Sequence, residues 1–180
     1  MPPVGDHGSA AMPSTEPERW IARDDTTLAI RVIAASDFAL EKAFIDGLSQ
    51  QTAYLRLLSI RKPQPEEIAR FTDIDPKREM AWIAVATVDG HDTMCGVARY
   101  VRDGDTAEWA IVLTDAWQGR GLGDKLLRKL IASARQAGIA VLSDVTFATN
   151  TAMLGLARKL GFALTREAGD ATLTRMTLRL

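Results

Sequence analysis

Three glycines at alternate positions, Gly119, Gly121 and Gly123, separate a strand-like run from a helix-like run and constrain the fold more than any other segment. The preceding residues 107–113 place apolar side chains at every second position, as a pleated strand requires. The residues that follow place leucines at helical spacing. Alternate glycines let backbone N–H groups approach a phosphate closely, and the first turn of a helix adds unpaired N–H donors. The segment therefore predicts an anion-binding turn between a strand and a helix.

The rest of the chain alternates between strand and helix patterns. Strands are predicted over residues 26–34, 80–88, 93–101, 107–113, 140–147, 162–167 and 171–180, and helices over residues 36–48, 51–58, 65–72, 122–137 and 150–160. Asp89-Gly90 joins two of the strands as a hairpin, so the sheet begins antiparallel. Residues 107–147 predict one right-handed parallel crossover. We therefore expect an α/β fold in which helices flank a mixed, mostly antiparallel sheet of about six or seven strands.

Residues 1–18 differ in composition from the rest of the chain. They hold four of the seven prolines and few side chains that a core would bury. We expect a disordered leader over residues 1–18 and a single domain over residues 19–180, because 180 residues with 47% apolar composition suit one core. His7 lies in this leader and His91 lies in a turn sequence, so no metal site is expected.

Charge and cysteine content argue against several classes of protein. The chain has 22 Lys plus Arg against 23 Asp plus Glu, so no net positive field favours nucleic acid or an anionic membrane. Its one cysteine, Cys95, permits no internal disulfide and is expected to be a small buried hydrophobe. The sequence contains neither a signal-peptide pattern nor an apolar run of about 18 residues. We therefore expect a cytoplasmic protein that binds neither nucleic acid nor a membrane.

A carboxylate precedes the glycines on the same strand. Glu108 lies about five residues before the end of that strand, which is ~16 Å along it. Coenzyme A has a phosphate end and a long arm that suit this spacing. Its pyrophosphate would rest on residues 119–123 and its pantetheine arm would run back along the strand, which brings the thioester toward Glu108. Glu108 would then accept a proton from an attacking amine, directly or through water.

These features resemble the GNAT superfamily of acyl-CoA-dependent N-acyltransferases. The pyrophosphate motif of that family is Arg or Gln, two further positions, Gly, any residue, then Gly or Ala, and it matches residues 118–123. The family's later helix, from Asn to Gly-Phe, matches residues 150–162. The stretches TLAIRVIAASD, FIDGLSQQTAYLRLL, FTDID and AEWAIVLTDAWQGRGLG are similar to the acetyltransferase domains of bacterial protein lysine acetyltransferases (Pat-like), which modify acyl-CoA synthetases. The resemblance implies the GNAT fold, acetyl-CoA as co-substrate and a protein lysine as the amine acceptor.

The resemblance also implies which residues form the site. Glu108 takes the position of the family's general base and would act by direct transfer in a ternary complex. Glu108, if desolvated, would be a stronger base, and we expect a backbone N–H near Val112 or Leu113 to polarise the thioester carbonyl. No metal is implied. The residues predicted to bind the cofactor are Ile111, Val112, Leu113, Gln118, Gly119, Arg120, Gly121, Leu122, Gly123, Asp124 and Asn150.

The last helix departs from the family pattern. Many members carry a tyrosine there, in a Leu-Tyr pair, that protonates the departing thiolate. In this chain Leu156 is followed by Ala157, and Tyr54 and Tyr100 lie elsewhere. No residue is therefore assigned as general acid, and solvent is expected to protonate the thiolate.

Each assignment has an alternative that involves no catalysis. The glycines alone are compatible with a tight strand-to-helix turn, Glu108 with an ion pair to Arg99, and Asn150 with a helix N-cap. A dinucleotide-binding turn needs a third glycine where Asp124 stands, and a P-loop needs Gly-Lys followed by Ser or Thr, which the sequence lacks. A non-catalytic acyl-CoA-binding regulatory module retains the same glycine turn and stays open.

The amine acceptor is the least constrained part of the prediction. Polyamines and aminoglycoside-like amines are alternatives to a protein lysine, because each presents a primary amine. We expect the acceptor to contact residues 46–75. Polar side chains there that are candidates for this contact are Ser59, Arg61, Lys62, Asp73 and Asp75.

Overall fold

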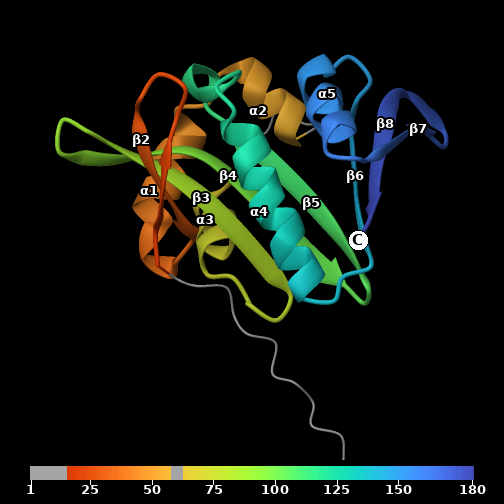
Figure 1. Ribbon diagram of the computed structural model, residues 1–180, viewed down its shortest axis with the longest axis horizontal. Coiled ribbons are helices and arrows are strands. Elements are labelled where there is room, and N and C mark those ends of the chain that lie inside the picture. Colours follow the sequence, from red (N-terminus) through yellow and green to blue (C-terminus); the bar gives the residue numbers. More distant parts are fainter. Residues whose placement is uncertain (1–15, 58–62) are drawn as a thin grey trace, which may run out of the picture.

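The computed structural model describes residues 16–57 and 63–180, which form one eight-stranded sheet with helices on both faces (Figure 1). The strand order is β1-β2-β3-β4-β5-β6-β8-β7, and every neighbouring pair is antiparallel except β5 and β6. The strands are β1 (Glu18–Ile21), β2 (Thr27–Val32), β3 (Glu79–Val88), β4 (His91–Asp103), β5 (Thr106–Leu113), β6 (Val141–Phe147), β7 (Ala163–Glu167) and β8 (Asp170–Arg179). The helices are α1 (Phe38–Asp46), α2 (Gln50–Leu57), α3 (Pro65–Thr72), α4 (Leu122–Gln136) and α5 (Thr151–Lys159), with 3₁₀ turns at Ala35–Asp37 and Asp115–Trp117.

The fold class predicted from the sequence is confirmed, including the mixed sheet and its one parallel pair. The sheet has one strand more than expected, because β1 was not predicted. β1 has only four residues, and contacts remote in sequence hold it: the Glu18 carboxylate pairs with Lys125 and Lys129 of α4. The sheet thus includes Glu18, the last residue of the predicted leader. Residues 1–15, with His7, lie outside the described residues, as do Ser59, Arg61 and Lys62.

Two apolar layers pack on opposite faces of the sheet. In Figure 1, α4 crosses one face and α1 and α3 lie behind the sheet. The α4 layer is centred on leucines that are fully buried, and the other layer packs α1 and α3 against β3 and β4. Leu122, Leu126, Leu127 and Leu130 belong to the first layer, and Phe44, Ile45, Ile68, Ile83 and Val97 belong to the second. The central strands are therefore covered on both faces, which fixes the position of β5.

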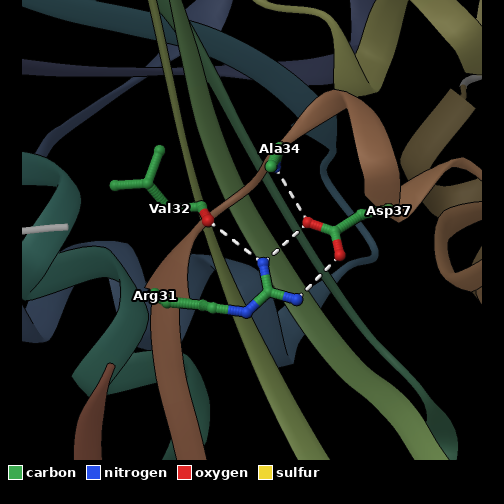
Figure 2. Close-up of polar contacts among 4 residues, drawn as sticks. All are labelled: Arg31, Val32, Ala34 and Asp37. Atoms are coloured by element: carbon green, nitrogen blue, oxygen red, sulfur yellow. Dashed lines mark hydrogen bonds and ion pairs between the residues drawn. The ribbon is translucent and has the colours of Figure 1, made fainter. Parts of the chain in front are cut away.

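A partly buried ion pair joins the end of β2 to the start of α1. Figure 2 shows the Arg31 guanidinium donating to both carboxylate oxygens of Asp37, at 2.6 and 2.7 Å, and to the Val32 carbonyl at 3.2 Å. Asp37 also accepts the Ala34 N–H at 2.8 Å. The hydrogen bonds from Arg31, with that from Ala34, hold the pKa of Asp37 below its ordinary value despite its burial. Asp37 therefore orders the entry to α1.

We expect Asp37→Ala to lower the free energy of unfolding by about 3 kcal/mol, because it leaves Arg31 and the Ala34 N–H without their acceptor. Since the pKa of Asp37 is lowered in the folded state, this contribution is present above about pH 4 and is lost as the pH falls through the folded-state value. Urea denaturation at pH 7 and pH 3 measures both effects. The control is Asp46→Ala, which removes an exposed pair with Lys42 and should cost less than about 1 kcal/mol. Equal losses from the two substitutions would contradict the structural role of Asp37.

Cys95 lies in the core, as predicted. Only 1% of its surface is exposed, and burial raises the pKa of its thiol to about 11. The thiol is therefore protonated at neutral pH and poorly suited to act as a nucleophile.

Candidate active site

The site is built where β5 and β6 separate. The two strands pair in parallel over only three positions, Thr106↔Val141, Ala107↔Leu142 and Glu108↔Ser143. Beyond Glu108, β5 continues to pair with β4, whereas β6 pairs with β8 along its whole length. A gap therefore opens between β5 and β6 directly after Glu108.

Backbone groups of β5 face this gap. The Asp105 carbonyl accepts the Ala140 N–H on the β6 side at 2.7 Å, and the Thr114 N–H donates to Cys95 on the β4 side at 3.0 Å. Backbone groups alternate in direction along a strand. The N–H and C=O groups of Trp109, Ile111 and Leu113 therefore point toward the gap.

The direction of the amides separates two residues that were predicted together to polarise the thioester. The Val112 N–H points toward β4, so it is unavailable for this role, whereas the Leu113 N–H points toward the gap. The Ile111 N–H also faces the gap and lies nearer to Glu108.

The gap is part of a cleft of about 670 Å³, which is within the usual size range of ligand sites. Four segments surround it: β5, the glycine turn with the start of α4, the end of β6 with α5, and α2. Among the residues predicted to bind the cofactor, those that line the cleft are Ile111, Val112, Leu113, Gln118, Gly119, Gly121, Gly123, Asp124 and Asn150. The structure therefore brings most of the predicted residues to one cleft.

The glycine turn has the backbone that its sequence predicts. Gly119 and Gly121 have φ values of 72° and 90°, a region that side chains with a Cβ rarely adopt. Gly121 is the N-cap of α4, so the unpaired N–H groups of the first helical turn lie at the cleft. A Cβ on Gly123 would lie 3.2 Å from Leu156 of α5, so this glycine permits close packing of the two helices.

Polar side chains connect the glycine turn to α2. Gln118 Nε2 lies 3.2 Å from the Thr52 hydroxyl and 3.4 Å from the Leu113 carbonyl. Thr52 and Ser49 both donate to Asp115, and these hydrogen bonds hold the pKa of Asp115 below its ordinary value. α2 is therefore fixed against the loop that precedes α4. No sequence pattern predicts this network, because Ser49 and Thr52 lie more than 60 positions from Asp115 and Gln118.

Charges near the turn are largely paired within the protein. The Arg120 side chain pairs with Asp24 and lies over the Trp117 ring, so it points toward the β1–β2 loop. Asp124 pairs with Arg128 and with Lys159 of α5, both at 2.8 Å, and these contacts lower its pKa. Backbone N–H groups are thus the main donors that the turn presents to an anion.

Glu108 lies at the closed end of the gap, on the sheet face opposite to α4. Its side chain is exposed, so the free protein does not supply the desolvation that would strengthen Glu108 as a base. Among the described residues, no hydrogen bond or ion pair engages its carboxylate, although the Arg175 guanidinium is close enough to interact electrostatically. The alternative partner Arg99 instead pairs with Glu41 at 2.8 Å. Glu108 is therefore available to a substrate from solvent.

The start of α5 fits both interpretations of Asn150. Its side chain accepts the Met153 N–H at 3.2 Å as an N-cap and donates to the Thr146 hydroxyl at 3.1 Å. Asn150 also lines the cleft. The helix-capping role is confirmed, and contact with the cofactor stays a prediction. Ala157, at the position of the family's tyrosine, is fully buried.

Tyr54 occupies a place that the sequence did not indicate. Its ring stacks on Phe147 at the end of β6, with 5.0 Å between centroids and 16° between planes. Tyr54 belongs to α2, so the stacked pair joins α2 to β6 beside the cleft. No sequence pattern signals this contact, because the two rings are far apart in the chain.

Several proteins of similar sequence are acetyltransferases. The chain is 32% identical to acetyltransferase PA5475 of Pseudomonas aeruginosa, over 91% of this chain and 91% of that protein. It is 30% identical to acetyltransferase Pat of Mycolicibacterium smegmatis, over 71% of this chain but only 39% of that protein. It is 31% identical to the L-amino acid N-acyltransferase MnaT of Escherichia coli, over 52% of this chain and 63% of that protein.

Solved structures share the fold. The GNAT domain of S. lividans PAT has a TM-score of 0.83 at 24% identity, and the match covers 94% of this chain and 100% of that chain. The yncA protein of Salmonella typhimurium, solved with acetyl-CoA, has a TM-score of 0.66 at 22% identity over 84% of this chain and 93% of that chain. The sequence profile of the acetyltransferase (GNAT) family matches residues 49–162. The chain therefore belongs to the GNAT family of acetyltransferases, which are acyl-CoA-dependent N-acyltransferases.

Proposed function

We propose that this protein transfers an acetyl group from acetyl-CoA to the side-chain amine of a protein lysine, for example in an acyl-CoA synthetase. The observation that supports this most is the gap between β5 and β6, which opens directly after Glu108 and continues to the glycine turn. The similarity to Pat and PA5475 supports the same class of reaction. The amine attacks the thioester directly while both substrates are bound.

Different parts of the cleft bind different parts of acetyl-CoA. Backbone N–H groups of residues 119–124 hold the pyrophosphate at the start of α4. The pantetheine arm lies in the gap, where its amides pair with the outward backbone groups of Ile111 and Leu113 as an added strand would. The Ile111 N–H polarises the thioester carbonyl, because it faces the gap and lies about 10 Å along the strand from Glu108.

Glu108 is the proposed general base. A lysine amine has a reference pKa of ~10.4 and must lose a proton before it attacks at neutral pH. The exposed position of Glu108 suits an acceptor that arrives on the surface of another protein. Such an acceptor would cover the carboxylate and supply the desolvation that the free protein lacks. Proton transfer through one water is compatible with this exposed position.

A small-molecule amine is the second candidate acceptor. The similarity to an L-amino acid N-acyltransferase favours this alternative, and polyamines or aminoglycoside-like amines belong to the same class. A non-catalytic acyl-CoA-binding regulatory module is the third candidate. It would retain the glycine turn and the cleft but would release no coenzyme A.

Release of free thiol separates these candidates. The protein is incubated with acetyl-CoA and, in separate reactions, with acyl-CoA synthetases, polyamines, aminoglycosides and amino acids. We expect thiol release that depends on a synthetase and exceeds release with the small amines by at least about tenfold, because only a protein acceptor desolvates Glu108. Release with small amines alone would contradict the lysine acceptor. Acetyl-CoA binding without any thiol release would indicate the regulatory module.

We also propose a cytoplasmic location, where acetyl-CoA and protein lysines are both present. Within residues 16–57 and 63–180, every helix is too short or too polar to serve as a membrane span. The buried thiol of Cys95 is compatible with a reducing compartment.

A further inference from the structure

A second cavity, of about 60 Å³, lies on the other face of the sheet from α4. Side chains from α1, the α1–α2 connection, α2, α3 and β4 form its walls, among them Phe44, Leu48, Ala53, Phe71 and Val97. Two residues of β5, Ala110 and Val112, line both this cavity and the cleft described above. The two cavities therefore adjoin across β5.

The cavity lies next to the expected position of the thioester. Side chains alternate along a strand, so Ala110 is on the same face as Glu108 and about 7 Å further along. The acyl carbon must lie between the arm in the gap and an amine on the Glu108 face. The part of the acyl group beyond that carbon then lies beside Ala110, which lines both cavities and has the smallest side chain of the three β5 residues 108, 110 and 112 on this face.

The walls of the cavity suit a neutral hydrocarbon chain. They are apolar except for Arg99 and Glu41, which form an ion pair at 2.8 Å. Arg99 also donates to the Phe71 carbonyl at 3.2 Å and lies over the Phe71 ring. The charges of the pair cancel, so the cavity offers no net attraction to a carboxylate at the end of an acyl chain.

The size of the cavity limits the length of that chain. A water molecule needs about 15 Å³ of such cavity space, so 60 Å³ accommodates a chain of about two or three carbon atoms. An acetyl group extends one methyl beyond its carbonyl carbon and would leave most of the cavity empty. Propionyl and butyryl groups would fill it.

We propose that this cavity is an acyl-chain pocket, and that the protein uses propionyl-CoA and butyryl-CoA as donors in addition to acetyl-CoA. The inference rests on the proposed function and concerns the same site. In the reaction the amine nitrogen forms a bond to the acyl carbon, the carbon–sulfur bond breaks, coenzyme A leaves as the thiolate, and Glu108 takes the amine proton. The acyl chain stays in the pocket until the amide product departs.

The test compares kcat/KM for acetyl-, propionyl- and butyryl-CoA with one acceptor. We expect propionyl-CoA to lie within about threefold of acetyl-CoA in the unmodified protein, and succinyl-CoA to be at least about 100-fold poorer. Ala53→Leu fills the pocket from α2 and should lower the propionyl-to-acetyl ratio by about tenfold or more. The matched control is Ala43→Leu, which adds the same atoms at an exposed position of α1 and should leave the ratio unchanged.

A second variant keeps the test informative if Ala53→Leu fails to fold. Leu48→Ala enlarges the pocket and should raise the butyryl-to-acetyl ratio of kcat/KM by about fourfold or more. This is the fold-change expected when roughly one additional methylene group is buried. Propionyl-CoA turnover 100-fold below that of acetyl-CoA, with ratios unmoved by either variant, would overturn the inference. A changed KM for the amine with unchanged acyl ratios would also overturn it, because the cavity would then hold the acceptor.

Binding distinguishes failure of this inference from failure of the proposed function. Calorimetric Kd values for acetyl-CoA and propionyl-CoA require no turnover. If neither donor is turned over, the proposed function fails, but Ala53→Leu should still weaken propionyl-CoA relative to acetyl-CoA if the pocket holds the acyl chain. Equal effects of Ala53→Leu on the two Kd values would contradict the pocket independently of catalysis.

Discussion

Glu108→Gln is expected to lower kcat by about 100-fold or more, while the Kd for acetyl-CoA changes by less than about twofold. The amide keeps the size and the exposed position of the side chain but cannot accept the proton of the attacking amine. Binding is expected to persist because the predicted contacts with the cofactor begin at Ile111 and extend toward the glycine turn, and Glu108 does not line the cleft. Steady-state kinetics with a protein acceptor and calorimetry with acetyl-CoA measure the two quantities.

The matched control for this substitution is Glu66→Gln. Glu66 is an exposed carboxylate on α3, so the same chemical change is made away from the cleft. Its kcat should stay within about twofold of the unmodified protein. A raised pH should partly restore the activity of Glu108→Gln, because more of the lysine amine is then deprotonated without a base. Turnover that is unchanged in Glu108→Gln would remove Glu108 as the base.

Gly121→Val is expected to raise the Kd for acetyl-CoA by about 100-fold. Gly121 has a φ of 90°, which a β-branched residue does not tolerate, and it is the N-cap of the helix whose N–H groups are proposed to bind the phosphates. The backbone must therefore shift at the proposed pyrophosphate site. Gly121→Asn should retain most of the affinity, because asparagine adopts positive φ more readily and a Cβ there meets little except the Trp20 ring at 4.0 Å.

Gly138→Val controls for the loss of stability that such a change causes. Gly138 follows the other end of α4 and has a φ of 70°, and a Cβ added there would meet nothing within 4 Å among the described residues beyond its chain neighbours. Its substitution imposes a similar backbone strain far from the cleft. The melting temperature should fall in both valine variants, whereas only Gly121→Val should lose affinity for acetyl-CoA. Equal Kd values for the two variants would contradict the role of the glycine turn.

Local patterns were sufficient to predict most of the fold. The glycine turn, α3 and the Asp89-Gly90 hairpin follow from chain conformation and spacing, which act over a few residues. Asp89 and Gly90 both have positive φ, at 51° and 78°, as a two-residue hairpin turn requires. β1 was missed because its pairing with β2 and its contacts with α4 are long-range and leave no periodic pattern in four residues.

The sequence predicted which residues line the candidate site better than it predicted the directions and contacts of their backbone groups and side chains. The direction of the gap-facing amides depends on strand pairing, so the sequence could not separate Val112 from Leu113. The exposure of Glu108 depends on which distant segments pack over its face of β5, so the sequence could not show whether Glu108 is desolvated. Arg99 and Arg120 have partners 58 and 96 positions away, which no spacing rule identifies.

The most direct test of the proposed reaction is mass spectrometry of an acyl-CoA synthetase after incubation with acetyl-CoA and this protein. Peptide mapping would locate any acetyl group on the synthetase. We expect an acetylated lysine that appears with the unmodified protein and is reduced by about 100-fold in initial rate with Glu108→Gln. A synthetase that stays unmodified while free amino acids or polyamines are acetylated would contradict the lysine acceptor, and equal acetylation by both proteins would contradict the catalytic role of Glu108.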